Sequence, residues 1–207
     1  KVALVTGGSQ GIGHAIAHGL AAEGARIVIA DLRGAEAAAE AFRNGVGLTA
    51  DVADEAGVEE LVNDAVVQCG SIDILVNNAG LYASLAMRPF TEIPLAEWRQ
   101  VMDVNVASMF LMCRAVVPVM QANGGGRIVN ISSGTPFRGV PFLLHYVTSK
   151  GAIVAFTRAL AKEVGKDDVL VNCVAPGFTM SAGVEAHPEV VDKLRDVSVA
   201  ARTIQRD

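Results

Sequence analysis

The sequence VALVTGGSQGIGHAIAHGLAAE, residues 2–23, begins with a short apolar run and passes through a glycine-rich turn into a helical pattern. A strand, a turn and a helix in this order bind phosphate groups, because the first turn of the helix presents unpaired N–H groups. Gly7 permits the tight turn, while Gly11 and Gly13 lack side chains and let a pyrophosphate and the neighbouring strand approach the backbone closely. The spacing G-x-x-x-G-x-G differs from the G-x-G-x-x-G of the common dinucleotide fold. We therefore predict a phosphate-binding turn, the alternative being a plain strand-to-helix turn.

Apolar runs and helical patterns alternate along the rest of the chain. Further strands are expected at 26–30, 45–49, 72–76, 127–131 and 169–174, and helices at 12–23, 35–42, 58–69, 97–121 and 147–164. The strands are continuous apolar runs, which is typical of strands covered on both faces. The alternation predicts an α/β fold, a three-layer doubly wound parallel sheet of the Rossmann type with six strands. The stretch 179–207 has no strand-like run and is expected to form helices and loops.

Length and composition favour a single domain over residues 1–207, because 51% of the residues are hydrophobic and can supply a sizeable core. The net charge of −5 and the pI near 5.4 argue against a nucleic-acid partner, which usually needs a basic face. No run of 18 or more uncharged apolar residues occurs, so we expect no membrane-spanning helix and no membrane partner. The chain starts directly in a strand-like run without a visible signal peptide, which favours a cytoplasmic location.

The cysteines indicate neither disulfides nor a metal site. Cys69, Cys113 and Cys173 are an odd number of thiols within apolar segments, and we expect them to be free and buried in a reducing cytosol. No Cys or His spacing is typical of zinc, so we predict no metal site.

Asp31 ends the second expected strand, about twenty residues after the glycine turn. A carboxylate at this place accepts hydrogen bonds from both ribose hydroxyls of NAD and would repel the extra phosphate of NADP. Arg33 is close by and could accommodate that phosphate. We therefore expect NAD as the cofactor, with NADP less favoured, and the alternative for Asp31 is a solvated strand end.

Tyr146 and Lys150 are four residues apart, with Ser133 upstream. On a helix this spacing puts both side chains on one face, where an ammonium and the positive end of an oxidised nicotinamide can together favour the phenolate and lower the phenol's ordinary pKa of about 10. Ser133 could then donate to a carbonyl oxygen as charge develops on it. The alternatives are an ordinary surface pair for Tyr146 and Lys150, and the adjacent Ser132 in place of Ser133. His145 is expected to be a pocket-wall or surface histidine, because neighbouring helix residues do not face each other.

Six motifs then occur in a family order: Thr6-Gly7-x-x-x-Gly11-Ile12-Gly13, Asn77-Asn78-Ala79-Gly80, Asn105, Ser133, Tyr146-x-x-x-Lys150 and Pro176-Gly177. From residue 1 to about 180 the chain resembles the classical short-chain dehydrogenases/reductases. The resemblance implies an oxidoreductase that transfers a hydride between NAD(H) and a secondary alcohol or ketone, with the chemistry of the hydride belonging to the cofactor. A catalytically silent dinucleotide-binding redox sensor or scaffold is the alternative, which would not need a phenol and an ammonium at this spacing.

The resemblance also implies roles for individual residues. Tyr146 would be the acid/base, Ser133 would hold the substrate oxygen, and Lys150 would bind the nicotinamide ribose and lower the pKa of the tyrosine. Asn105 would anchor a water that leads to Lys150, unless it is an ordinary polar helix residue that bonds to the backbone. The catalytic set is therefore Asn105, Ser133, Tyr146 and Lys150.

The implied cofactor site is larger. Asp51 and Val52 resemble the pair that contacts adenine, and Thr179 is similar to the residue that touches the nicotinamide carboxamide. The predicted cofactor-binding residues are Gly7, Ser9, Gln10, Gly11, Ile12, Gly13, Asp31, Leu32, Asp51, Val52, Asn78, Ala79, Gly80, Tyr146, Lys150, Pro176, Gly177 and Thr179. One departure from the family is Thr148, where alanine is usual. Another is the lack of the arginine that many NADP-using members carry just before the second glycine, which agrees with Asp31.

The substrate would be chosen by residues 135–144 and by a loop region at 179–200. Phe137, Val140, Phe142, Leu143 and Phe178 suggest a mainly apolar pocket for a small alcohol or ketone. The residue that follows Phe137, Arg138, could meet an acidic substrate or be a solvated loop charge.

The long helices predict subunit assembly, and the chain length predicts a further C-terminal segment. The long helices near 102–122 and 148–164 carry apolar residues on more than one face, and in the family such helices pack into a four-helix subunit interface. We predict a homotetramer, with a dimer as the next possibility. Family members usually end with another helix and a seventh strand, so we expect the native protein to continue beyond residue 207.

Overall fold

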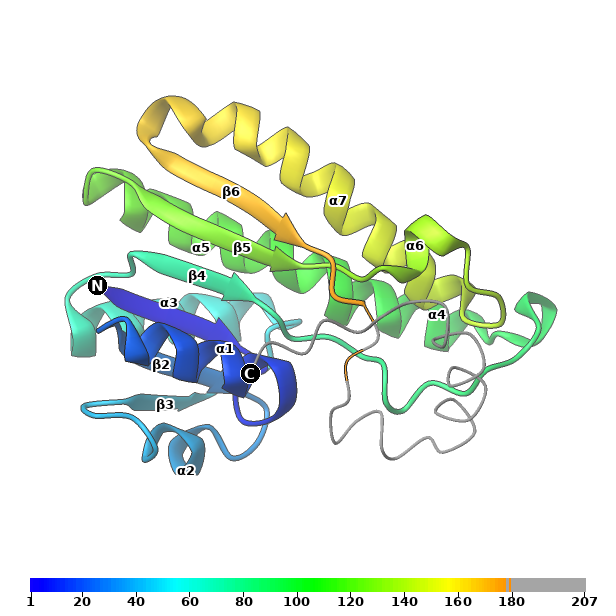
Figure 1. The fold of residues 1–207 in the computed structure, drawn as a ribbon, viewed down its shortest axis with the longest axis horizontal. Coiled ribbons are helices and arrows are strands. Elements are labelled where there is room, and N and C mark those ends of the chain that lie inside the picture. The colour runs from blue at the N-terminus through cyan, green and yellow to red at the C-terminus, as the bar shows by residue number, and fades with distance from the viewer. Residues whose placement is uncertain (178, 180–207) are drawn as a thin grey trace.

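The computed structural model describes residues 1–177 and 179, and Figure 1 shows its layers. Six strands form one parallel sheet in the order β3-β2-β1-β4-β5-β6. Their bounds are β1 Val2–Thr6, β2 Arg26–Asp31, β3 Val46–Thr49, β4 Ile74–Asn77, β5 Gly126–Ile131 and β6 Val169–Val174. The chain runs outward from β1 to β3 and then crosses back to β4, so the strand order reverses between β1 and β4. In open α/β sheets a ligand binds at this reversal, beyond the carboxyl ends of the strands.

The helices lie on both faces of the sheet, as predicted. Their bounds are α1 Gly11–Ala22, α2 Ala35–Ala39, α3 Glu55–Cys69, α4 Leu95–Met102, α5 Ser108–Ala122, α6 Thr135–Arg138 and α7 Leu144–Val164. Two short 3₁₀ turns, η1 Phe90–Glu92 and η3 Gly165–Asp167, and a π-helical segment, η2 Asp103–Ala107, complete the described elements. The doubly wound Rossmann fold is confirmed in the described residues, and the substrate loop expected at 179–200 lies outside them except for Thr179.

Several boundaries differ from the predicted ones for local reasons. Helix α3 begins at Glu55 rather than Val58, because the Asp54 carboxylate accepts a hydrogen bond from the Gly57 N–H at 2.9 Å and caps the helix. Helix α2 ends at Ala39, three residues before Phe42, and α7 begins at Leu144, three residues before the predicted start. The earlier start of α7 matters most, because it brings Tyr146 inside the helix.

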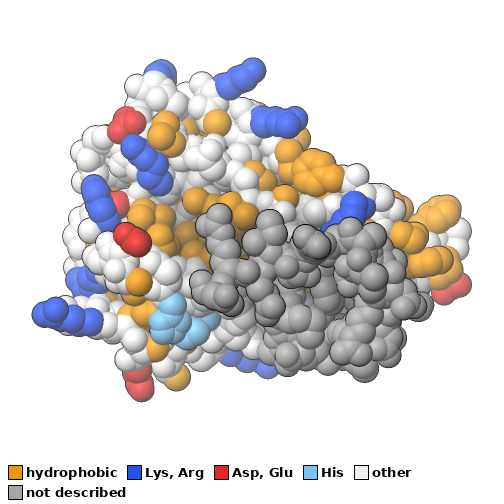
Figure 2. Space-filling view, in the orientation of Figure 1, with side chains coloured by type: hydrophobic (Ala, Val, Ile, Leu, Met, Phe, Trp, Pro, Cys, Tyr) orange, Lys and Arg blue, Asp and Glu red, His pale blue; other side chains and the backbone are white. Residues whose placement is uncertain are grey.

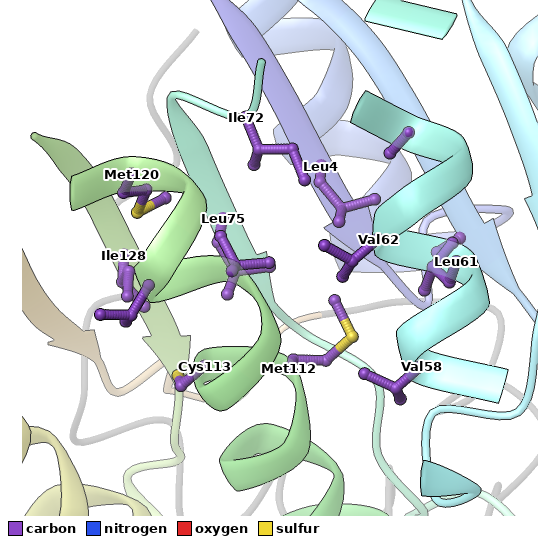
Figure 3. Close-up of a cluster of buried hydrophobic side chains, with 14 of the residues drawn as sticks. Leu4, Val58, Leu61, Val62, Ile72, Leu75, Met112, Cys113, Met120 and Ile128 are labelled. Atoms are coloured by element: carbon purple, nitrogen blue, oxygen red, sulfur yellow. The ribbon is translucent and has the colours of Figure 1, made fainter. Parts of the chain in front are cut away.

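Two apolar clusters hold the layers together. The first joins alternate strand residues such as Leu4 and Leu75 to α3, α5 and α7, and its central side chains are drawn in Figure 3. The second joins the other strand faces, with Val5 and Ile29, to Ala17 of α1 and Ala35 of α2. Successive strand residues point to opposite faces of a sheet. The continuous apolar runs of the sequence therefore supply both clusters.

The segment from α4 through η2 to α5, Leu95–Ala122, is one continuous helix that is apolar and long enough to cross a membrane, although we expected no such helix. Half of its apolar window is buried in the molecule, and a core helix of a globular protein meets the same test of length and composition. On the face shown in Figure 2, the coloured Lys and Arg side chains stand singly among acidic and apolar ones.

Of the three free cysteines, Cys113 is buried, and Cys69 and Cys173 are only half-buried.

Candidate active site

A cavity of about 610 Å³ opens at the carboxyl ends of the strands, where the strand order reverses. Its size is typical of a site for a small molecule or cofactor. Most of the predicted site residues line it: Gly7, Gln10, Gly11, Ile12, Asp31, Leu32, Asp51, Val52, Asn78, Ala79, Gly80, Ser133, Tyr146, Lys150, Pro176, Gly177 and Thr179. Ser9, Gly13 and Asn105 do not line the cavity.

The glycines of the first turn have different tasks. Gly7 and Gly11 have positive φ angles of 61° and 58°, a conformation that side chains other than hydrogen disfavour. A Cβ atom at Gly11 would meet no atom within 4 Å, so this part of the cavity wall is open to a ligand. A Cβ atom at Gly13 would lie 2.3 Å from the Gly7 carbonyl oxygen and 2.4 Å from Asn78 Nδ2. Gly13 therefore serves the packing of helix against turn, whereas we had expected it to face the pyrophosphate as well.

Thr6 and Asn78 tie the ends of β1 and β4 together. The Asn78 side-chain amide donates to the carbonyl oxygens of Thr6 at 3.0 Å and Gly7 at 2.9 Å. In return, Thr6 Oγ1 accepts the backbone N–H groups of Asn78 and Ala79, both at 3.1 Å. The sequence motif includes Thr6, but this linking role was not predicted. The one feature of the sequence that points to it is a hydroxyl residue at the end of the first strand.

Asp31 is held in the cavity wall beside the glycine turn. Its Oδ2 atom accepts the Ser9 N–H at 3.1 Å, which leaves the other carboxylate oxygen for a further donor. Asp51 lines the same end of the cavity, and its Oδ1 atom accepts the Ala53 N–H at 2.9 Å. Arg33 is exposed and does not line the cavity. This end of the cavity is therefore acidic.

The two candidate serines have different partners. Ser132 donates its hydroxyl to the Lys150 backbone oxygen at 2.6 Å, so its proton is used in joining β5 to α7. Ser133 Oγ accepts from the Thr135 backbone N–H at 3.2 Å and from the Thr135 hydroxyl at 3.1 Å, which leaves its own proton available. The Ser133 hydroxyl also acts on the neighbouring phenol, because it lowers the pKa of Tyr146. The geometry therefore favours Ser133 over Ser132 as the residue that can donate into the cavity.

Tyr146 and Lys150 lie on one face of α7 but do not form a close pair. The Lys150 Nζ atom is 5.8 Å from the centre of the Tyr146 ring and donates to the Ile131 carbonyl oxygen at 2.9 Å. Burial lowers the pKa of Lys150 to about 8, against a smaller opposing effect of Cys173. Both side chains are buried, so neither belongs to an ordinary surface pair.

The pKa of Tyr146 is shifted in the direction opposite to our expectation. Burial raises the pKa of this phenol, the hydrogen bond with Ser133 lowers it by less, and Tyr82 raises it further. Desolvation therefore outweighs the lowering effect of Ser133 in the protein itself. The centroids of the Tyr82 and Tyr146 rings are 5.0 Å apart, so the Tyr82 ring covers one side of the phenol.

Asn105 lies in η2 and is 2% exposed. Its Oδ1 atom accepts the Leu81 N–H at 2.6 Å, and its Nδ2 atom donates to Leu81 O at 3.3 Å and Ser149 Oγ at 3.0 Å. A Cβ atom at Gly80 would lie 3.1 Å from Asn105 Oδ1 and 3.4 Å from Lys150 Nζ. The contacts favour the alternative in which Asn105 holds the backbone, here the segment that passes in front of Lys150.

His145 is neither a pocket-wall nor a surface residue, which corrects both expectations. It is 0% exposed and does not line the cavity. Its Nε2 atom is 3.0 Å from Glu97 Oε1, and the other oxygen of Glu97 accepts from Arg88 at 3.3 Å. Sequence reasoning missed Glu97 and Arg88, because their distance from His145 along the chain carries no signal of contact.

The apolar wall of the cavity is also only partly as predicted. Val140 and Leu143 line it, whereas Phe137 and Phe142 are exposed and do not. Phe178 lies outside the described residues. The segment after β4 contributes instead, through Leu81, Tyr82, Ala83 and Met87.

Comparisons with known proteins agree on one family. The family model for short chain dehydrogenase matches residues 1–190 of the chain. The 3-oxoacyl-(acyl-carrier-protein) reductase FabG of Escherichia coli (strain K12) is 38% identical over 182 residues, which cover 86% of this chain and 73% of the relative. The 3-oxoacyl-(acyl-carrier-protein) reductase of Synechocystis is 36% identical over 198 residues, which cover 91% of this chain and 79% of the relative.

Solved structures give the same result. A protein from Burkholderia xenovorans assigned to the short-chain dehydrogenases/reductases superposes with a TM-score of 0.90 at 34% identity, covering 99% of this chain and 83% of its own. The 3-ketoacyl-(acyl-carrier-protein) reductase of Brucella melitensis, solved in complex with NADH, superposes with a TM-score of 0.86 at 33% identity, covering 90% of this chain and 78% of its own.

Proposed function

The chain belongs to the classical short-chain dehydrogenases/reductases and is an oxidoreductase, and from this premise we propose that it transfers a hydride between NAD(H) and a secondary alcohol or ketone. One observation carries the proposal. Ser133 and Tyr146 line the wall of the same cavity that contains the glycine turn, and the Ser133 hydroxyl is near enough to the phenol to lower the pKa of Tyr146. A phenol and a hydroxyl that meet beside a dinucleotide site suit proton transfer to a carbonyl oxygen.

The residues of the cavity fit a dinucleotide. The open space at Gly11 admits phosphates close to the first turn of α1, where unpaired N–H groups favour anions. At the acidic end, Asp31 has one carboxylate oxygen available for ribose hydroxyls, which supports NAD over NADP. The Brucella relative was solved with NADH, which also supports NAD. Pro176, Gly177 and Thr179 line the opposite end, where we place the nicotinamide.

Each residue has a defined part in the reducing direction. Ser133 and Tyr146 hold the ketone oxygen by hydrogen bonds. Burial keeps the Tyr146 phenol protonated at neutral pH, so it can give its proton to that oxygen. When bound, the cofactor would supply the hydride for the new C–H bond, and the proton from Tyr146 would complete the C–OH group. Lys150 lies behind Tyr146 as a buried cation that favours the phenolate left after the transfer.

We extend the proposal to the assembly and location of the protein. We infer a homotetramer built on α5 and α7, with a dimer as the alternative, and a cytoplasmic protein whose free thiols suit a reducing compartment. Residues 1–207 would act as one dinucleotide-binding catalytic domain whose substrate loop lies at 179–200.

The test is a panel of secondary alcohols and ketones with NAD(H) and NADP(H), read at the nicotinamide absorbance. We expect turnover with NAD(H), and we expect Tyr146→Phe to lower kcat by about 10²- to 10⁴-fold because it removes the proton donor. NADH binding by this variant should persist. Thr148→Ala, which changes an exposed residue of the same helix outside the cavity wall, is the control and should retain turnover.

Retained turnover in Tyr146→Phe would overturn this mechanism. NADH binding without turnover of any member of the panel would instead favour the rival function, a catalytically silent redox sensor or scaffold.

A further inference from the structure

The cavity is lined by charges of opposite sign at its two ends. Asp31 and Asp51 lie at the end built by β2 and β3, whereas Lys150 and Arg138 lie at the end built by β5, α6 and α7. Lys150 donates a hydrogen bond to the Ile131 carbonyl oxygen. In the proposed function it also binds the cofactor and favours the phenolate of Tyr146. Arg138 has no part in that function, although it lines the wall beside the reacting groups.

The Arg138 side chain folds back over the backbone next to Ser133. A Cβ atom at Gly134 would lie 3.2 Å from Arg138 Nη2, 3.8 Å from its Nε atom and 3.4 Å from the Pro176 carbonyl oxygen. Gly134 is the N-cap residue of α6 and Arg138 is its last residue, so the two lie on one face of this short helix and the guanidinium covers the turn that follows Ser133. Arg138 and Ser133 line the same cavity, so the positive charge faces the space in which a ketone oxygen would bind.

An ion pair within the described residues does not explain this placement. Arg88, Arg114 and Arg127 each face a carboxylate in the described part of the chain, whereas Arg138 has no carboxylate within salt-bridge distance there. Other exposed arginines, such as Arg43, also lack such a partner, but among the described arginines only Arg138 lines the cavity. The two alternatives that the sequence left for Arg138 are therefore unequal, because its side chain lines the cavity and no carboxylate of the described residues neutralises its charge.

We propose, on the premise of the proposed function, that the substrate is a short oxo acid or hydroxy acid and that Arg138 binds its carboxylate. The carboxylate would lie only a few bonds from the reacting carbon, so that one small molecule reaches both Ser133 and the guanidinium. A guanidinium offers two parallel N–H groups to a carboxylate and holds it in one orientation. Tyr82, Met87 and Leu143 would enclose the aliphatic part of the molecule.

The test compares kcat/KM for a keto acid with kcat/KM for its uncharged methyl ester. With NADH, we expect the wild-type protein to reduce 3-oxobutanoate with a higher kcat/KM than its methyl ester. Arg138→Met should lower the ratio of the two kcat/KM values, acid over ester, by about 10- to 100-fold, the range expected for loss of a charge-assisted bidentate bond. Arg138→Lys should recover part of the ratio, because it restores the charge without the fork. Arg43→Met removes an exposed arginine elsewhere and should leave the ratio unchanged.

A second measurement does not depend on turnover. Malonate, a short dicarboxylate without a ketone, should bind the NADH complex of the wild-type protein, detected by NADH fluorescence, and should bind Arg138→Met at least 10-fold more weakly. An unchanged ratio of acid to ester in Arg138→Met, or equal malonate affinity in the two proteins, would overturn the role of Arg138. Turnover of neutral ketones without preference for the acid would refute this inference and leave the proposed function standing. NADH binding with no ketone turned over would refute the proposed function instead.

Discussion

At the scale of single residues, the glycines of the turn after β1 differ in what a side chain would meet. A methyl group at Gly13 overlaps the Gly7 carbonyl oxygen and the Asn78 amide, and neither can move without breaking the link between β1 and β4. We expect Gly13→Ala to lower the free energy of unfolding by about 3 kcal/mol. At Gly11 the space is open and only the positive φ opposes a side chain, so Gly11→Ala should cost about 1 kcal/mol but weaken NADH binding.

Gly19 provides the control for this series. It lies inside α1, has no positive φ, and a Cβ atom there meets nothing within 4 Å. Gly19→Ala should therefore raise the free energy of unfolding by about 0.5–1 kcal/mol without changing NADH affinity. Urea denaturation and NADH titration of the three variants check the prediction. A Gly13→Ala protein as stable as Gly11→Ala would contradict the packing role of Gly13.

Lys150 makes stability depend on pH. Burial lowers its pKa from 10.5 to about 8 in the folded protein, so the unfolded chain holds this proton over a range in which the native protein has lost it. The unfolded state then binds more protons, and the contribution of Lys150 to stability rises with pH between these two pKa values. Between pH 7.5 and pH 10 we expect wild type to gain about 2 kcal/mol relative to Lys150→Met.

Comparison with Lys150→Met is necessary because other groups act in the opposite direction. Burial raises the pKa of Cys113 to about 12 and also raises that of Tyr146, so both lose stability contributions as the pH rises through the range in which the unfolded groups ionise. Urea denaturation of both proteins at fixed concentration gives the difference at each pH. A difference that stays constant from pH 7.5 to pH 10 would show that Lys150 keeps an ordinary pKa.

The sequence predicted which residues share one cavity where a motif has fixed spacing, and it did not predict contacts that join distant segments. Gly7, Ser133 and Tyr146 all line one cavity, as expected from their order along the chain. The pKa of Tyr146 was expected to fall, because spacing reveals a nearby ammonium but not how deeply the phenol is buried. The burial of His145 was missed for the same reason, since the depth of a helix face depends on what packs over it.

At the scale of elements, the contact between α4 and α7 depends on a short polar chain. Glu97 of α4 meets the fully buried His145 of α7 and also Arg88, whose backbone N–H donates to Phe142 O at 3.0 Å. Glu97→Ala should leave His145 and Arg88 without this acceptor and lower the free energy of unfolding by about 2 kcal/mol. Glu97→Gln keeps an amide oxygen and should lose about half as much.

Glu92 is the matched control, because it is an exposed glutamate on η1 without an ion pair among the described residues. Glu92→Ala should change the free energy of unfolding by less than about 0.5 kcal/mol. Urea denaturation of Glu97→Ala, Glu97→Gln and Glu92→Ala measures these changes in the free energy of unfolding. Equal stability of Glu97→Ala and Glu92→Ala would mean that the polar chain does not hold α4 against α7.

Element types and order were predictable, and boundaries were less so. The strands followed from continuous apolar runs, because each strand is covered by helices on both faces. The π-helical segment η2 was not predicted, because its residues Asp103–Ala107 continue the helical pattern of α4 and α5. Its effect on function is local, since it carries Asn105 to the Leu81 backbone. A wider turn of this kind needs tertiary contacts that periodicity does not show.

At the scale of the whole molecule, the alternation of strands and helices predicted the doubly wound sheet, and the family resemblance is confirmed by the comparisons. The strand order places β1 and β4 side by side, so the glycine turn after β1 and the segment after β4 meet in one cavity. The direction of each side chain within that cavity could not be predicted. Arg138, for example, lines the cavity, although its position in the sequence does not show whether it faces the cavity or the solvent.

Exposed apolar side chains on α5 and α7 bear on subunit assembly. Phe110 on α5 is 48% exposed and Leu144 on α7 is 45% exposed, and both would be covered if these helices met their copies in a second subunit. We expect a tetramer by light scattering at micromolar concentration. Phe110→Glu should dissociate it to smaller species, because each copy would have to desolvate a carboxylate in an apolar contact. Val67→Glu, which alters an exposed valine on α3, should leave the tetramer intact. A wild-type protein that is monomeric at micromolar concentration would refute the assembly, and a Phe110→Glu protein that remains tetrameric would place the interface on another face.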